Sequence, residues 1–226
     1  MSATLGVLSP PPDAIRGRRD FPLSEEEQVH LERLIQQMEE VLLPLLSVRT
    51  PGQLERLLRE NARSYLHLRN ELWGLVAGSL DTAAVVSLVH EIYGQLTTRV
   101  QEDTKVLSSA DREILVGILG SVQGLFDAAV QTSGAEQARL VDIMMECGDA
   151  LQRADMCFSA VLFVLSGEIT QWELGAIRLL CRNADRYMLD VEDVFLAHDK
   201  KIHERLKSES QTIPLEEVKR RIGLSS

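Results

Sequence analysis

Apolar residues recur every three or four positions along most of this chain, which is the spacing of one face of an α-helix. No segment shows the strict alternation of apolar and polar residues that indicates a β-strand. The sequence therefore predicts an all-α fold, a bundle of about six long and mostly antiparallel helices. We expect a flexible arm with prolines and arginines over residues 1–22, one bundle domain over residues 23–209, and a short C-terminal helix or tail over residues 210–226.

Polar residues that cap helices mark where several of these helices begin. Ser24 is followed three residues later by Glu27, a capping box that predicts the start of the first helix. Pro44 should kink or end that helix, because proline lacks the backbone N–H that the helix needs. Later helices are predicted to begin after these capping residues: Thr50, Asp81, Ser108 or Ser109, and Thr170.

The fourth predicted helix, about residues 109–131, is apolar around most of its circumference. A helix of this kind lies in the middle of a bundle, so we expect it to be the most buried element. Gly117, Gly120 and Gly124 follow one side of it, which predicts the close approach of a neighbouring helix. Replacing Gly120 or Gly124 with leucine would then cost roughly 1–3 kcal/mol by overpacking. Polar residues interrupt its apolar run, so we do not expect this segment to span a membrane.

The last two long helices carry unbroken apolar seams over residues 140–164 and 174–202. The two seams are out of phase across residues 166–167, which indicates a turn between antiparallel helices rather than one continuous helix. Residues equally far from that turn should face each other, which places Cys157 level with Cys181. Small residues in the middle of both seams predict a close contact between the helices there.

Composition and charge narrow the classes of function. Aromatic residues are 4% of the chain and the formal net charge is −10, so neither base stacking nor phosphate attraction favours nucleic-acid binding. The chain has 3 cysteines and no C-x-x-C spacing, which is typical of reduced thiols in a cytoplasmic protein. No signal peptide is expected, because the apolar stretch at the N-terminus is too short.

The sequence contains few candidates for catalysis. The motifs G-x-x-x-x-G-K-S/T, G-x-S-x-G and H-E-x-x-H do not occur. Two pairs of acids at helical spacing, Glu146 with Asp149 and Asp190 with Asp193, have the form of a magnesium site in an all-α phosphohydrolase. Both pairs lie off the apolar seams, which favours a solvated surface. We therefore predict no metal, no cofactor and no enzymatic activity.

The favoured hypothesis is a cytoplasmic, non-enzymatic bundle that acts as an interaction, adaptor or regulatory module through contacts with an unidentified protein. Two alternatives remain open: a sensor that binds an apolar ligand in its core, with His198 as a polar core contact, and the metal-dependent phosphohydrolase. The apolar surface around residues 158–165 also predicts a homodimer. The candidate partner contacts are Arg16, Arg18, Arg19, Phe158, Phe163, Lys219, Arg220 and Arg221.

Overall fold

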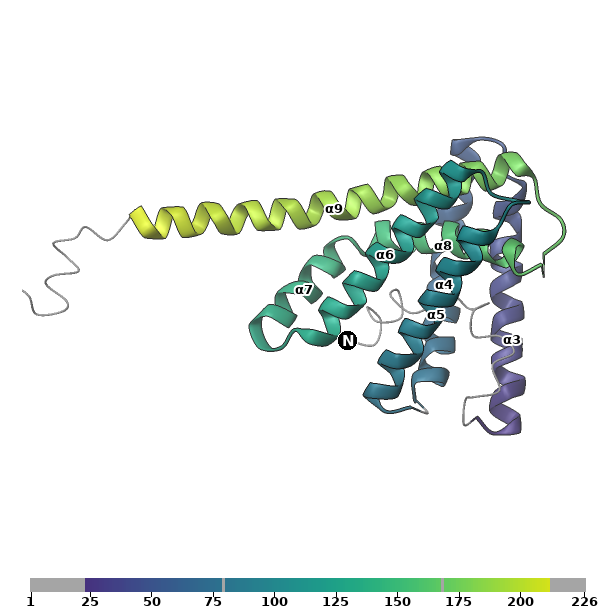
Figure 1. Ribbon diagram of the computed structural model, residues 1–226, viewed down its shortest axis with the longest axis horizontal. Coiled ribbons are helices and arrows are strands. Elements are labelled where there is room, and N and C mark those ends of the chain that lie inside the picture. The colour runs from purple at the N-terminus through teal and green to yellow at the C-terminus, as the bar shows by residue number, and fades with distance from the viewer. Residues whose placement is uncertain (1–22, 79, 168, 212–226) are drawn as a thin grey trace, which may run out of the picture.

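The computed structural model describes residues 23–78, 80–167 and 169–211 (Figure 1). The prediction of an all-α fold is confirmed, since the described residues form seven α-helices, one short 3-10 helix and no strand. In chain order the elements are α3 (Glu25–Leu42), η1 (Leu43–Ser47), α4 (Pro51–Gly78), α5 (Thr82–Glu102), α6 (Ser109–Gln131), α7 (Gly134–Glu146), α8 (Gly148–Leu165) and α9 (Leu174–Gln211).

The capping residues begin the first helices as the sequence indicates. In the capping box of α3, Glu27 N–H donates to Ser24 Oγ at 3.3 Å and Ser24 N–H donates to Glu27 Oε2 at 2.8 Å. Ser108 and Asp111 form a second capping box at the start of α6, and Asp81 caps α5 by accepting a hydrogen bond from the N–H of Ala84. Pro44 lies in the first turn of η1, so α3 ends where proline was expected to end it.

The most buried element is α8, not α6. Twelve of the 18 residues of α8 are buried, whereas five of the 23 residues of α6 are buried. Helices α3, α4, α7 and α9 and the turn η1 all pack against α8, while α6 packs on α5, α7 and α9 and stays at the edge. The prediction that α6 occupies the middle of the bundle is therefore wrong. Helices α6 and α8 are both apolar around most of their circumference, so this property did not show which of the two lies in the middle of the bundle.

The glycines of α6 do not mark a close contact between helices. A Cβ atom added at Gly117, Gly120 or Gly124 would meet no other atom within 4 Å. Leucine at Gly120 or Gly124 would therefore not overpack a neighbouring helix, and the prediction of close approach is wrong. The glycines instead leave one side of α6 open.

The C-terminal helices form the predicted antiparallel pair, with two local differences. The α8–α9 contact is the most extensive between any two elements described, and Cys157 and Cys181 are both fully buried in it. The expected seam helix over residues 140–164 is divided into α7 and α8 at Cys147. Gly167, with φ of +79°, then turns the chain after α8, a conformation that favours glycine.

Helix α9 begins at Leu174, three residues later than an N-cap at Thr170 would place it. The N–H of Glu173 donates to Leu46 O at 3.0 Å, and Arg49 Nη2 lies 3.0 Å from Glu173 Oε1. These contacts tie Glu173 to η1 and to the loop after it, and residues 169–173 stay outside the helix. The 38 residues of α9 then span ~57 Å, and the C-terminal part of the helix projects beyond the other helices (Figure 1).

Gly120→Ala should stabilise the protein, because Gly120 lies inside an exposed helix with open space around its Cα. The expected gain in the free energy of unfolding is about 0.5–1 kcal/mol, measured by urea denaturation. Gly167→Ala is the matched control and should destabilise, because its φ is positive. A loss of stability in Gly120→Ala would show that this side of α6 is covered.

Phe163→Ala should remove a fully buried side chain from α8 and cost about 3–5 kcal/mol. Val130 on α6 is 38% exposed, so Val130→Ala should stay within about 0.5 kcal/mol of the wild type. Equal losses in the two variants, measured by the same denaturation, would contradict the central position of α8.

Candidate binding groove

Helices α6 and α9 contact each other, and residues of both helices line two adjoining hollows between them. The hollow near the start of α6 has a volume of about 400 Å³, and the one farther along has about 370 Å³. Both are lined by Ser121, Met188 and Glu192, so they form one continuous trough, which we call the α6–α9 groove. The groove extends from Ala110 to Leu125 along α6.

The floor and walls of the groove are mostly apolar. Gly117, Ser121 and Gly124 recur at a spacing of three to four residues, and their lack of bulk forms the hollow on the α6 side. On the α9 side, Leu189 is 52% exposed and Leu196 is 65% exposed. The remaining apolar lining residues are Ile114, Ile118, Leu125, Met188, Val191 and Phe195.

The charged side chains that line the groove are all acidic. Glu113 lies on α6, and Asp185 and Glu192 lie on α9, so carboxylates flank the apolar floor from both helices. No described residue forms an ion pair or hydrogen bond with these three carboxylates. Their charge is therefore available to a molecule that enters the groove.

The hydropathy of α6 is high for a helix so little covered. Its most apolar window has a mean hydropathy of 1.5, and 22% of that window is buried. Within the described part of the chain, α6 is long and apolar enough to cross a membrane by length and composition. Apart from Val130, which is 38% exposed, the large apolar residues of α6 are buried or partly buried against the core, so the helix presents partly covered apolar side chains and exposed glycines to the solvent.

The predicted partner contacts Phe158 and Phe163 do not lie on the surface. Their side chains are 4% and 0% exposed, because α8 is enclosed by helices of its own chain. The apolar surface that suggested a homodimer is covered in the same way. The other candidate contacts, Arg16, Arg18, Arg19, Lys219, Arg220 and Arg221, fall outside the described residues.

His198 lies between α9 and α7 rather than in the core. Its Nε2 is 2.8 Å from Glu146 Oε2, and its side chain is 24% exposed. One residue farther on, Arg139 Nη2 lies 3.0 Å from Asp199 Oδ1. The hydrogen bond from His198 lowers the pKa of Glu146. His198 therefore helps to hold α7 against α9 and is not a polar contact inside an apolar cavity.

The two acid pairs are used in different ways. Glu146 is paired with His198, and Asp149 lies 3.5 Å from Arg153 Nη2 in an ion pair on α8. Asp190 and Asp193 are exposed on α9. No group of three or more potential ligands that could hold a metal ion occurs among the residues that the structure describes. The acids thus lack the convergence that the phosphohydrolase hypothesis requires.

A buried ion pair that the sequence analysis missed links α4 and α8. Arg69 Nη2 lies 3.0 Å from Asp155 Oδ1, and their side chains are 1% and 11% exposed. The hydroxyl of Tyr65 donates to Asp155 Oδ2 at 2.6 Å and also lies 3.0 Å from Ser159 Oγ. Burial raises the pKa of Asp155 to about 6, although the Arg69 charge and the Tyr65 hydroxyl oppose this. In the sequence, Arg69 could have indicated this ion pair, because it is a charged residue on the apolar stripe between Tyr65 and Leu72.

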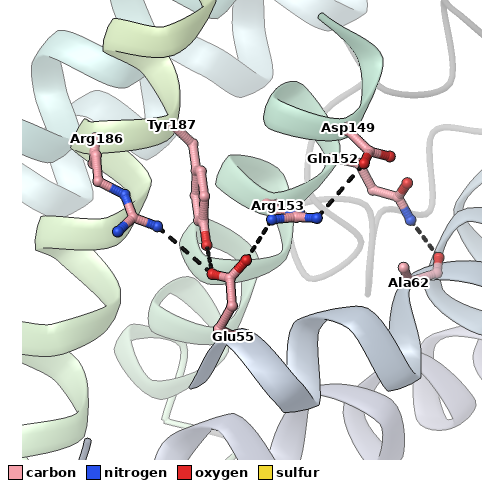
Figure 2. Close-up of polar contacts among 7 residues, drawn as sticks. All are labelled: Glu55, Ala62, Asp149, Gln152, Arg153, Arg186 and Tyr187. Atoms are coloured by element: carbon pink, nitrogen blue, oxygen red, sulfur yellow. Dashed lines mark hydrogen bonds and ion pairs between the residues drawn. The ribbon is translucent and has the colours of Figure 1, made fainter. Parts of the chain in front are cut away.

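A second polar cluster, centred on Glu55, joins α4, α8 and α9 (Figure 2). Glu55 Oε1 lies 2.5 Å from Arg153 Nη1, and Glu55 Oε2 accepts a hydrogen bond from the Tyr187 hydroxyl at 2.5 Å. The guanidinium groups of Arg153 and Arg186 lie 5.8 and 4.8 Å from the centre of the Tyr187 ring. Gln152, which precedes Arg153 on α8, donates a hydrogen bond from its side-chain amide to the carbonyl of Ala62 on α4 (Figure 2). These contacts fix α9 to the rest of the bundle.

Comparison with known proteins gives no relative for this chain. No protein family, no curated protein and no solved structure matches it. The case for a function therefore depends on the groove and on the helices that form it.

Asp155 predicts a dependence of stability on pH. Its pKa of about 6 in the folded protein exceeds the ordinary value of about 3.9, so the folded state binds more protons between these pH values. The free energy of unfolding of the wild type, relative to Asp155→Asn, should fall as pH rises from about 4 to about 6. Chemical denaturation of the wild type and of Asp155→Asn across that pH range measures this difference in the free energy of unfolding. A rise instead would mean that the Arg69 charge outweighs burial.

Proposed function

We propose that this protein is a non-enzymatic interaction module that binds a segment of a protein partner in the α6–α9 groove. One observation carries the proposal: an apolar helix with little burial lines an open trough together with exposed leucines of α9. Exposed apolar surface that is rimmed by polar residues is typical of interaction sites.

The shape of the groove favours a protein segment over a small apolar ligand. The two hollows are open along one side, whereas pockets for small molecules enclose most of the ligand surface. A helix that lies in a trough between two other helices buries one apolar face and leaves the other in water. This geometry supports an interaction module more than the core sensor.

The surroundings of the groove support a preformed site. The Glu55 cluster holds the first half of α9 against α4 and α8. Helix α6 packs on α5, and His90 Nε2 lies 2.8 Å from Asp127 Oδ1 between the same two helices. A site whose walls are already ordered loses less conformational entropy when it binds.

Site-specific photo-crosslinking tests the proposal. Ser121→Cys keeps the small side chain of the groove floor, and a photoreactive group attached to this thiol by a flexible tether should form a crosslink to a discrete protein in an extract of native cells, whereas the three native cysteines are buried. The double variant Leu189→Glu and Leu196→Glu should abolish that product, because charges in the groove prevent an apolar face from docking. The readout is the crosslinked band identified by mass spectrometry.

The matched control places the same cysteine and tethered photoreactive group at Ser64, an exposed serine of α4 that does not line the groove. It should not give the Ser121 product. The same product at both positions, or a Ser121 product that the leucine variants leave unchanged, would reject the groove as the binding site.

A further inference from the structure

We infer that the partner segment is a basic amphipathic helix of about 15 residues, with apolar residues facing the floor of the α6–α9 groove and lysine or arginine along both flanks. This inference depends on the proposed function and adds the chemical class of the partner. It is argued from the length of the groove, its small residues and the sign of its charges.

The length and the floor of the groove fit a helix. The 16 residues from Ala110 to Leu125 span ~22 Å along α6. A partner helix of about four turns has the same length. Gly117, Ser121 and Gly124 let its axis come near α6, within the usual 8–10 Å of packed helices. Leu189 and Leu196 then provide apolar contacts on the α9 wall.

The charges on both walls determine the sign of the charge that the partner segment must carry. A docked helix has Glu113 along one flank and Asp185 and Glu192 along the other. Basic residues on both flanks of that helix would complement these carboxylates, and acidic residues would be repelled. The same charges disfavour a second copy of this chain docked groove to groove, because equivalent carboxylates would then meet. They also disfavour anionic membrane surfaces.

The chain's own basic segment after α9 is a less suitable occupant. Helix α9 continues ~28 Å from Glu192 to Gln211, directed away from the groove. A segment that follows Gln211 therefore starts ~28 Å from Glu192, at the far end of a helix that leads away from the groove. A segment of another protein has no such limit.

Binding of synthetic peptides to the full-length protein tests the inference. The probe is a fluorescent peptide of about 16 residues with leucines on one face and lysines on both flanks. A matched peptide carries glutamate in place of every lysine. Fluorescence anisotropy should show that the lysine peptide binds at least about tenfold more tightly than the glutamate peptide, as expected for several complementary charges at the rim of an interface. Equal affinities would overturn the inference.

Charge reversal in the protein separates the groove from the overall acidity. Glu113→Lys with Glu192→Lys should weaken binding of the lysine peptide about tenfold. The control Glu40→Lys with Glu102→Lys changes the net charge equally at exposed positions outside the groove and should have little effect. Equal loss in both double variants would show attraction to the net charge alone and would reject the inference.

Deletions and mass measurements test the other occupants. Removal of residues 1–20 or 212–226 should leave the affinity for the lysine peptide unchanged. A gain of about tenfold or more would identify the deleted segment as the occupant and overturn the inference. A dimer in sedimentation that the peptide converts to a monomer would likewise assign the groove to a second copy.

The two proposals fail in different ways. If the Ser121 crosslink depends on Leu189 and Leu196 but charge reversal at Glu113 and Glu192 has no effect on peptide binding, the groove binds a protein and the basic class is wrong. If the Ser121 crosslink does not depend on the leucines, the proposed function itself is wrong.

Discussion

Helix α8 presents apolar or small side chains in every direction, so it is stable only where other helices enclose it. Burial of its residues is the constraint that arranges the rest of the chain, because α3, α4, α7, α9 and η1 all pack around this one helix. Of the polar residues on α8, Gln152, Arg153, Asp155 and Ser159 have partners on α4, and Asp149 pairs with Arg153 on α8 itself. A buried charge without such partners would cost several kcal/mol. The polar contacts of α8 therefore specify where α4 and α9 lie.

Enclosing α8 leaves α6 at the edge of the bundle. Helix α6 packs mainly on α5 and α9, so part of its apolar circumference has no neighbour within the described chain. At the same edge, α9 continues past the other helices with Leu189 and Leu196 exposed. The groove thus forms where the described helices do not cover all of the apolar surface of α6 and α9.

Much of the fold could be predicted from the sequence, because capping and periodicity are local signals. Ser24, Asp81 and Ser108 begin their helices where the capping rules place them. Burial was harder to predict, since α6 and α8 are both apolar on most sides and only the tertiary arrangement decides which is enclosed. Arg69 and Asp155 were missed for a related reason: each lies among apolar residues, and their pairing depends on a long-range contact between α4 and α8.

The glycines of α6 show how a wrong prediction can indicate a site. Gly117, Gly120 and Gly124 were interpreted as a contact surface within the bundle, yet each faces open space. Glycine inside a helix costs about 1 kcal/mol relative to alanine, so three such residues on an exposed face weaken α6 with no compensating contact among the described residues. Local rules that a stable fold would satisfy are most often broken where a protein binds something. A partner helix packed against Gly117 and Gly124 would supply the missing contact. The glycines that weaken α6 are therefore the same residues that form the floor of the α6–α9 groove.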